Sequence, residues 1–261
     1  MWRDNTSVQG KGGFWLCLAL LLLTTRCLAA EPSVALFYGA NPPWNELRAF
    51  DVVVVDPDHA AVNPAAHAHA DSSLFAYASL GEVHPSRPWF NDVPPRWQLG
   101  RNPAWGSVVL DASAPGYPAF VTDKIIAPLW DQGYRGFFLD TLDSWQLVAK
   151  TPEARARQQA GLIAAIRAIK ARYPEARLIF NRGFEILPEV HALAWRVAAE
   201  SLVSGHDHAT NGVVPVSEAD RAWLLARLQE VKERYHLPVL VIDYVAAGQR
   251  DARAESGELR V

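Results

Sequence analysis

Residues 136–145 read Gly136-Phe137-Phe138-Leu139-Asp140-Thr141-Leu142-Asp143-Ser144-Trp145. The segment begins as a run of apolar residues and ends in two carboxylates, a hydroxyl and an aromatic ring. Strands that are buried along their length and carry acids only at their C-terminal end are typical of (β/α)8 barrels, whose functional side chains cluster at that end. The segment therefore predicts a barrel strand with functional residues where it ends.

The same design recurs along the chain. Each further run is short, nearly continuously apolar and without strict alternation, which is the pattern of strands covered on both faces in a parallel sheet. Helical patterns lie between the runs, and strand–helix alternation of this kind predicts an α/β fold, here a (β/α)8 TIM barrel. The candidate strands are Val34–Tyr38, Val52–Asp56, Leu74–Leu80, Val108–Asp111, Gly136–Asp140, Leu178–Asn181, Val197–Glu200 and Val239–Asp243.

Two helices have clear start signals. Thr151-Pro152-Glu153 supplies an N-cap, a proline at the first helical position and an early acid, and Pro174 ends the apolar stripe that follows. Ser217-Glu218-Ala219-Asp220 resembles a capping box and precedes a second stripe. Weaker patterns predict helices at Trp44–Phe50, Pro118–Gln132 and Phe184–Ala194.

The run Val108–Asp111 is short, and an alternative places it outside the barrel. Val239–Asp243 is then the seventh strand, and the barrel is incomplete at its C-terminus. Under that alternative, the chain is a fragment of a longer protein.

The N-terminal 30 residues carry a weakly basic start, an apolar run at 14–23 and the small residues Ala29 and Ala30. This pattern predicts a signal peptide at 1–30 and a single enzyme domain at 31–261, with an uncleaved anchor as the alternative. Cys17 and Cys27 both lie in the predicted leader, so the mature chain has no thiol and no disulfide. We expect a periplasmic or secreted protein that keeps no stable membrane span after cleavage.

The charge balance limits the kind of ligand. The chain has a net charge of −3, of which residues 1–30 contribute +2, so residues 31–261 carry −5. Mild acidity argues against a nucleic-acid partner and is compatible with a neutral or cationic ligand. Ten tryptophans are present, mostly beside Pro, Gly or Asn in predicted loops, where exposed rings are suited to stacking on sugars.

Polar residues end most of the candidate strands. Because the C-terminal ends of barrel strands meet at one rim, we expect these side chains to form a cluster there. Three of the acids have an equally good structural explanation, since Asp56, Asp111 and Asp243 could hold loops or Arg182. The residues at or just after strand ends are Tyr38, Asp56, Glu82, Asp111, Asp140, Asp143, Asn181, Arg182, Glu200, Asp243 and Tyr244.

Paired carboxylates at one site indicate glycoside hydrolysis, in which one acid acts as nucleophile or base and the other protonates the leaving oxygen. Asp140 ends the most apolar strand, and Glu200 follows small alanines that leave room for a ligand. Asp143 either binds a hydroxyl or caps the next helix. The His-Xaa-His pairs at 67–69 and 206–208 lie in predicted loops, and we expect no metal and no cofactor. Neither a Gly-Xaa-Ser-Xaa-Gly elbow nor a phosphate-binding glycine loop occurs.

Several segments carry a family resemblance that extends over nearly all of residues 33–247. They include the pattern Ser79-Leu80-Gly81-Glu82 and, further along, Gly136 to Asp143, which contains Asp140. In these segments the chain resembles the TIM-barrel glycoside hydrolases of family 114, a group also classed in family 166. The other segments are 36–39, 53–57 and 241–244.

The resemblance implies an endo-acting, retaining α-1,4-galactosaminidase that acts on partly de-N-acetylated N-acetylgalactosamine exopolysaccharide in the biofilm matrix. It implies Asp140 as the nucleophile and Glu200 as the general acid/base, and the export machinery of the polysaccharide as a partner. The expected sugar-binding residues are Tyr38, Asp56, Glu82, Asp143, Asn181, Asp243 and Tyr244. The alternatives are a non-catalytic polysaccharide-binding barrel and a hydrolase of another α-galactoside.

Overall fold

The computed structural model describes residues 31–60, 64, 73–207, 210 and 212–244. All elements named below belong to one unit, Pro32–Val261. The predicted signal peptide lies outside the described residues, as do His67, His69 and His208. Within the described residues, no helix combines the length and apolar character that crossing a membrane requires.

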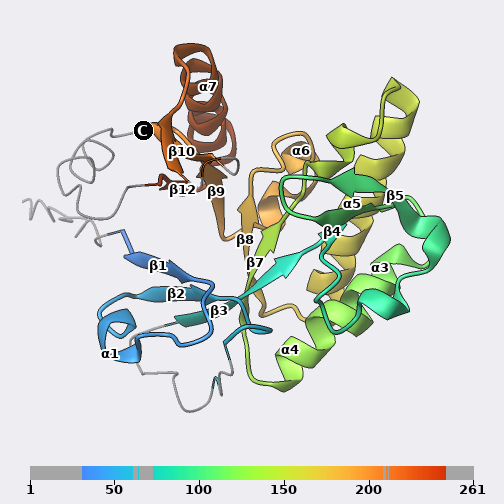
Figure 1. Ribbon diagram of the computed structural model, residues 1–261, viewed down its shortest axis with the longest axis horizontal. Coiled ribbons are helices and arrows are strands. Elements are labelled where there is room, and N and C mark those ends of the chain that lie inside the picture. The colour runs from blue at the N-terminus through green and yellow to red at the C-terminus, as the bar shows by residue number, and fades with distance from the viewer. Residues whose placement is uncertain (1–30, 61–63, 65–72, 208–209, 211, 245–261) are drawn as a thin grey trace, which may run out of the picture. The chain divides into compact units, whose positions relative to one another are not determined.

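A seven-stranded parallel sheet organises the fold (Figure 1). Every pair of neighbouring strands runs parallel, and the sheet curls into the arc of a (β/α)8 barrel, which confirms the predicted fold class. The strands, in their order across the sheet, are β1 (Val34–Phe37), β2 (Val52–Val55), β3 (Ser73–Ser79), β7 (Gly136–Asp140), β8 (Arg177–Asn181), β9 (Arg196–Glu200) and β12 (Val239–Ile242).

The run at 108–111 is not a barrel strand. It forms β6 (Ser107–Leu110), which pairs antiparallel with β4 (Glu82–Val83) and β5 (Gln98–Asn102) in a separate small sheet. The segment between β4 and β5 contains only two short 3-10 turns, η1 (Phe90–Asp92) and η2 (Pro95–Trp97), and therefore lacks the crossover helix that a parallel strand needs. The alternative that placed this run outside the barrel is correct, and β12 is the seventh strand.

The two well-signalled helices occur as predicted. In α5 (Pro152–Arg172) the Thr151 hydroxyl accepts the Ala154 backbone N–H at 3.2 Å, and in α7 (Glu218–Tyr235) Ser217 caps Asp220 at 3.1 Å. The weaker patterns give shorter or composite helices. These are α1 (Trp44–Leu47), the consecutive α3 (Tyr117–Phe120), η3 (Val121–Ile126) and α4 (Ala127–Asp131), then η4 (Ser144–Leu147), α6 (Leu187–Val190) and η5 (His191–Leu193).

A β-hairpin follows β9 where a loop was expected. Its strands are β10 (Ser204–Asp207) and β11 (Gly212–Pro215), and they pair antiparallel. His206 lies in β10.

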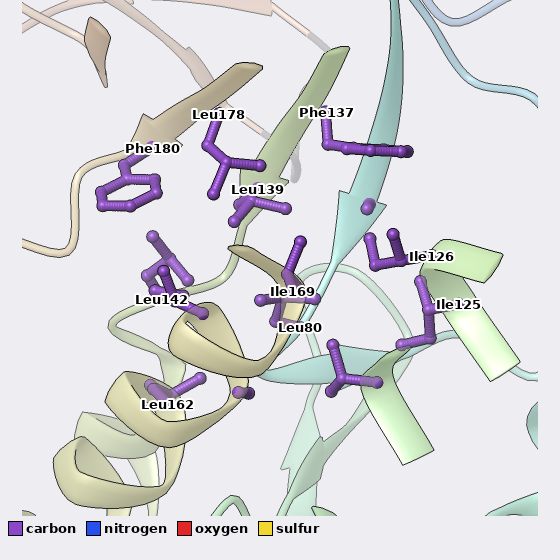
Figure 2. Packing of buried hydrophobic residues seen from close by; sticks show 14 of the residues in the cluster. Leu80, Ile125, Ile126, Phe137, Leu139, Leu142, Leu162, Ile169, Leu178 and Phe180 are labelled. Atoms are coloured by element: carbon purple, nitrogen blue, oxygen red, sulfur yellow. The ribbon is translucent and has the colours of Figure 1, made fainter. Parts of the chain in front are cut away.

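The two faces of the sheet contact different partners, because successive side chains on a strand point to opposite sides. On β7, Phe137 and Leu139 pack in the main core with Leu162 and Ile169 of α5 (Figure 2). Phe138 belongs instead to a second cluster on the other face, together with Val54, Phe75, Ile179 and Ala198. Continued by two residues, the rows of Phe138, Ile179 and Ala198 reach Asp140, Asn181 and Glu200. The strand register therefore directs these three polar residues to the inner face of the barrel.

Candidate active site

Asp140 and Glu200 are brought together by the strand between them. They end β7 and β9, and Asn181 ends β8, which pairs with both. The Asn181 Nδ2 lies 2.7 Å from Asp140 Oδ1 and 3.1 Å from Glu200 Oε1. The two distances together limit the separation of these carboxylate oxygens to at most 5.8 Å. The pair predicted from the sequence therefore shares one site.

Each carboxylate also accepts a hydrogen bond from a phenol. The Tyr77 hydroxyl donates to Asp140 Oδ2 at 2.6 Å, and the Tyr244 hydroxyl donates to Glu200 Oε2 at 2.6 Å. Burial, and then the negative charge of Asp140, raises the pKa of Tyr77 well above its usual value. Burial raises the pKa of Tyr244 as well, and its hydrogen bond to Glu200 adds to the effect. Both phenols therefore remain protonated donors over the working pH range.

Tyr38 and Tyr77 line the same side of the site. Tyr38 directly follows β1, and its ring meets that of Tyr77 edge-on with centroids 5.2 Å apart. Tyr38 is exposed, so its ring is accessible to a ligand at the mouth. Its position agrees with the expected contact to a sugar.

Glu82 and Asp143 line a hollow of about 360 Å³ that also reaches Asp140 and Glu200. Glu82 is buried and accepts hydrogen bonds from Ser107 Oγ and, at 3.0 Å, from Asn102 Nδ2. Burial raises the pKa of the Asp143 carboxyl, and Arg182, whose Nη1 lies 3.9 Å from Asp143 Oδ2, partly opposes this. Both acids are therefore part of the site's wall.

Asp56 differs from its expected role. Only 4% of the residue is exposed, and its two oxygens accept Nη1 and Nη2 of Arg87 at 2.7 and 2.9 Å. The same guanidinium packs over the Tyr77 ring at 5.4 Å from the centroid. Asp56 thus orients Arg87, which in turn supports Tyr77, and the partner is Arg87 rather than the Arg182 considered from the sequence.

Asp243 also differs from its expected role as a sugar-binding residue. Its Oδ1 accepts the backbone N–H groups of Leu202, Val203 and Ser204 at 2.8, 2.8 and 3.1 Å. The register explains the difference, because Leu240 and Ile242 belong to the inner cluster whereas Val239 and Val241 pack with α7 on the other side. Asp243 continues the outer row and anchors the loop after Glu200, while Tyr244 continues the inner row.

Asp111 follows the structural alternative. Its Oδ1 accepts the Ser113 backbone N–H at 3.0 Å and Gln158 Nε2 at 2.6 Å. Asp111 therefore ties the loop after β6 to α5.

Three residues of the site were missed by the sequence analysis as ligand-facing groups: Tyr77, Arg182 and Trp105. Arg182 has a left-handed backbone with φ of 55° and donates Nε to the Glu200 carbonyl at 2.9 Å. Trp105, which is 58% exposed, lies in the β5–β6 turn. Tyr77 could have been found from its spacing of two from Ser79, and Trp105 from its turn sequence Asn102-Pro103-Ala104-Trp105-Gly106.

The mouth contains a second hollow beside the first. It has a volume of about 340 Å³ and shares Trp105, Arg182 and Glu200 with the 360 Å³ hollow. Space for a ligand therefore extends to both sides of Glu200. Trp223, which is 45% exposed, lines the second hollow at its far side.

Not all tryptophans are sugar platforms. Trp97 and Trp145 are buried in the main core, and Trp130 stacks on Tyr173 at 4.6 Å. Among the residues that the structure describes, no three His, Cys, Asp or Glu side chains are grouped so that they could hold a metal ion.

Comparisons with known proteins agree with the site. The model of glycoside-hydrolase family GH114 matches residues 27–258. The glycoside hydrolase domain of PelA from Pseudomonas aeruginosa is 38% identical and superposes with a TM-score of 0.78, over 88% of this chain and 91% of that one. Ega3 of Aspergillus fumigatus, solved in complex with galactosamine, is 16% identical with a TM-score of 0.58, over 84% of this chain and 83% of that one, and supports the fold alone.

An uncharacterised protein of Deinococcus radiodurans is 27% identical over 214 residues, which are 75% of this chain. The match spans 65% of that protein's length. With the family match over most of its length and a carboxylate pair at the barrel mouth, this chain is a glycoside hydrolase that belongs to family GH114.

Proposed function

We propose that the protein is a secreted or periplasmic endo-glycosidase that cleaves α-1,4-linked, partly de-N-acetylated N-acetylgalactosamine exopolysaccharide with retention of configuration. The observation that carries the mechanism is the shared hydrogen-bond donor of Asp140 and Glu200, which limits one oxygen pair to 5.8 Å. Retaining enzymes place the two carboxyl groups about 5–5.5 Å apart, whereas inverting enzymes need roughly 6.5–9.5 Å for a water molecule. The upper limit is below the inverting range.

The chemistry proceeds in two displacements. Asp140 attacks the anomeric carbon while Glu200 gives its proton to the departing glycosidic oxygen, and a glycosyl ester forms on Asp140. Glu200, now ionised, takes a proton from water, and that water releases the sugar from Asp140 with a second inversion. Tyr77 stabilises the leaving carboxylate of Asp140, since its hydroxyl already donates to Oδ2.

The charge of the mouth supports the substrate class. The 360 Å³ hollow is lined by Glu82, Asp140, Asp143 and Glu200, with Arg182 as its one basic residue. A polymer with free amines is cationic, so this acidic wall attracts it. The relationship to the PelA domain and the galactosamine bound to Ega3 support the same class.

The cellular assignment rests on the N-terminal sequence. Residues 1–30 have the composition of a signal peptide, and we propose export to the periplasm or the medium, a role in processing a biofilm matrix and contact with the polysaccharide export machinery. N-terminal sequencing of the exported protein tests the leader. A mature chain that still begins at Met1 contradicts it.

The activity is tested by digestion of defined α-1,4-galactosamine oligosaccharides, with the first anomer of the new reducing end followed by NMR. The α anomer is expected first, because two inversions restore the configuration. A first product with the β anomer contradicts the retaining mechanism. Binding without any new reducing ends identifies a non-catalytic barrel instead.

A further inference from the structure

A third hollow lies beyond the active site and shares a wall with it. It has a volume of about 260 Å³ and lies beside α7 and the segment that leads into α6. Trp223 lines both this hollow and the 340 Å³ hollow that contains Glu200. The space around the catalytic pair therefore continues past Trp223. The residues that line the third hollow are Phe184, Glu185, Pro188, Trp223, Arg227, Glu230 and Tyr235.

The aromatic residues of this hollow suit a sugar chain. The rings of Phe184 and Trp223 meet edge-on with centroids 5.9 Å apart, and Trp223 remains 45% exposed. An exposed ring held by a second ring offers a rigid apolar face on which the C–H face of a sugar can stack. Tyr235, at the end of α7, adds a third ring with a polar tip.

The charged residues indicate which groups the chain carries. Glu185 and Glu230 provide two carboxylates against the single guanidinium of Arg227, so the wall has an acidic excess. Arg227 is held 3.0 Å from Glu230 and 6.0 Å from the centre of the Trp223 ring. Glu185 accepts Gln146 Nε2 at 3.1 Å, and Gln146 itself lines the 360 Å³ hollow. Glu185 is thus connected to the catalytic mouth and open to an amine.

We propose that this third hollow is a remote subsite that binds the substrate polymer several sugars away from the bond that is cleaved. The inference rests on the proposed function, because the occupant is the same amine-bearing chain. Trp223 supplies the stacking surface between the second and third hollows, and Glu185 pairs with an amino group. The volume of about 260 Å³ is just below the roughly 300–1,000 Å³ of small-molecule pockets, so the hollow holds a short stretch of chain.

The test compares kcat/KM for galactosamine oligosaccharides of increasing length. For the native protein kcat/KM rises with length until the third hollow is filled. Glu185→Gln removes roughly three- to tenfold of kcat/KM for long chains, the size of one such contact, and leaves the shortest cleaved chain unchanged. Trp223→Ala removes the same gain and also raises KM for intermediate chains.

Two further variants separate a local contact from a general effect of charge. Arg227→Ala removes the opposing charge and increases kcat/KM for long chains only. Glu189→Gln is the matched control, since Glu189 lies on α6 but pairs with Arg167 at 2.8 Å and does not line the hollow. An equal loss in Glu189→Gln and Glu185→Gln overturns the subsite.

The outcomes distinguish this inference from the proposed function. If native protein cleaves every length equally well, the remote subsite is wrong and the activity stands. If it cleaves galactosamine chains of no length, both are wrong. A length dependence that survives in Trp223→Ala and Glu185→Gln also overturns the subsite while the activity stands.

Discussion

Asp140 and Glu200 accept hydrogen bonds from the same atom, Nδ2 of Asn181, at 2.7 and 3.1 Å. Asn181 is only 8% exposed, so solvent cannot easily replace this donor. A single amide thus sets the distance between the two acids and offsets the repulsion between them. The relationship makes Asn181 the residue whose removal tells most about the pair.

Asn181→Ala removes the shared donor. We expect kcat to fall by roughly 10²-fold, the typical effect of losing one preorganised donor, with a smaller change in KM. The pH dependence of kcat shifts as well, because each carboxylate loses a hydrogen bond that favours its ionised form. Steady-state kinetics between pH 4 and 8 measure both. An unchanged pH profile contradicts the bridging role.

Asp140→Asn removes the proposed nucleophile and keeps the shape of the side chain. We expect kcat to fall by at least roughly 10³-fold, because losing a covalent nucleophile leaves only binding and electrostatic effects. Thermal unfolding shows whether the fold is retained. Asp131→Asn on the exposed end of α4 is the matched control and keeps full activity. Retained activity in Asp140→Asn excludes Asp140 as the nucleophile.

Asp243→Ala leaves three backbone N–H groups without their acceptor. Hydrogen bonds to a charged group contribute about 1.5–3 kcal/mol each, and water can replace part of this, so a loss of about 3 kcal/mol is expected. The loop begins directly after Glu200, so kcat falls too. Urea denaturation compares the variant with Asp243→Asn, which keeps an acceptor and loses less. Equal stability of Asp243→Ala and native protein contradicts the anchoring role.

Asp143→Asn tests the effect of burial on a carboxyl group. The pKa of Asp143 is raised in the folded state, so folding favours its protonated form. The native protein therefore loses stability as the pH rises through the unfolded pKa of about 3.9 toward the folded pKa, and the full penalty applies above it. Asn carries no charge, so the variant is more stable than the native protein at pH 7, and the difference vanishes at low pH. Urea denaturation at both pH values measures this, and a variant that is less stable at pH 7 contradicts it.

Salt separates the cationic substrate from a neutral one. Attraction between the acidic hollow and the amines of the polymer is screened over about 8–10 Å at physiological ionic strength. We expect kcat/KM for de-N-acetylated chains to fall as NaCl is raised from about 0.01 to 0.5 M, and kcat/KM for fully acetylated chains to change little. A matched pair of oligosaccharides of equal length provides the control. Equal salt dependence of both contradicts the role of the acidic wall.

Much of the fold could be predicted because its signals are local. The continuous apolar runs around Phe137 and Val54 indicate strands covered on both faces, and the caps Thr151 and Ser217 mark the starts of the two long helices. Val108–Asp111 was ambiguous for a physical reason. A short apolar run has the same composition in a barrel strand and in an antiparallel insertion, and only its pairing with β4 and β5 separates them.

The candidate site was predicted in part. Asp140, Asn181, Glu200 and Tyr244 all lie where parallel strands end, and the period of two along each strand turns them to one face. The same period turns Asp243 away, but the sequence does not show at which residue the pleat of β12 begins. A shift of one residue exchanges the faces, so Asp243 and Tyr244 could not be told apart without the register.

The sequence by itself determined the type of strand, the caps of the long helices and the set of acids at strand ends, since each depends on residues near in the chain. Only the tertiary structure decided which of those acids face each other. Asp56 reaches Arg87 across 31 residues, and Asn181 joins Asp140 and Glu200 across 41 and 19. Such contacts depend on how the sheet curls and on the register of its strands, and both are properties of the packed molecule rather than of any single segment.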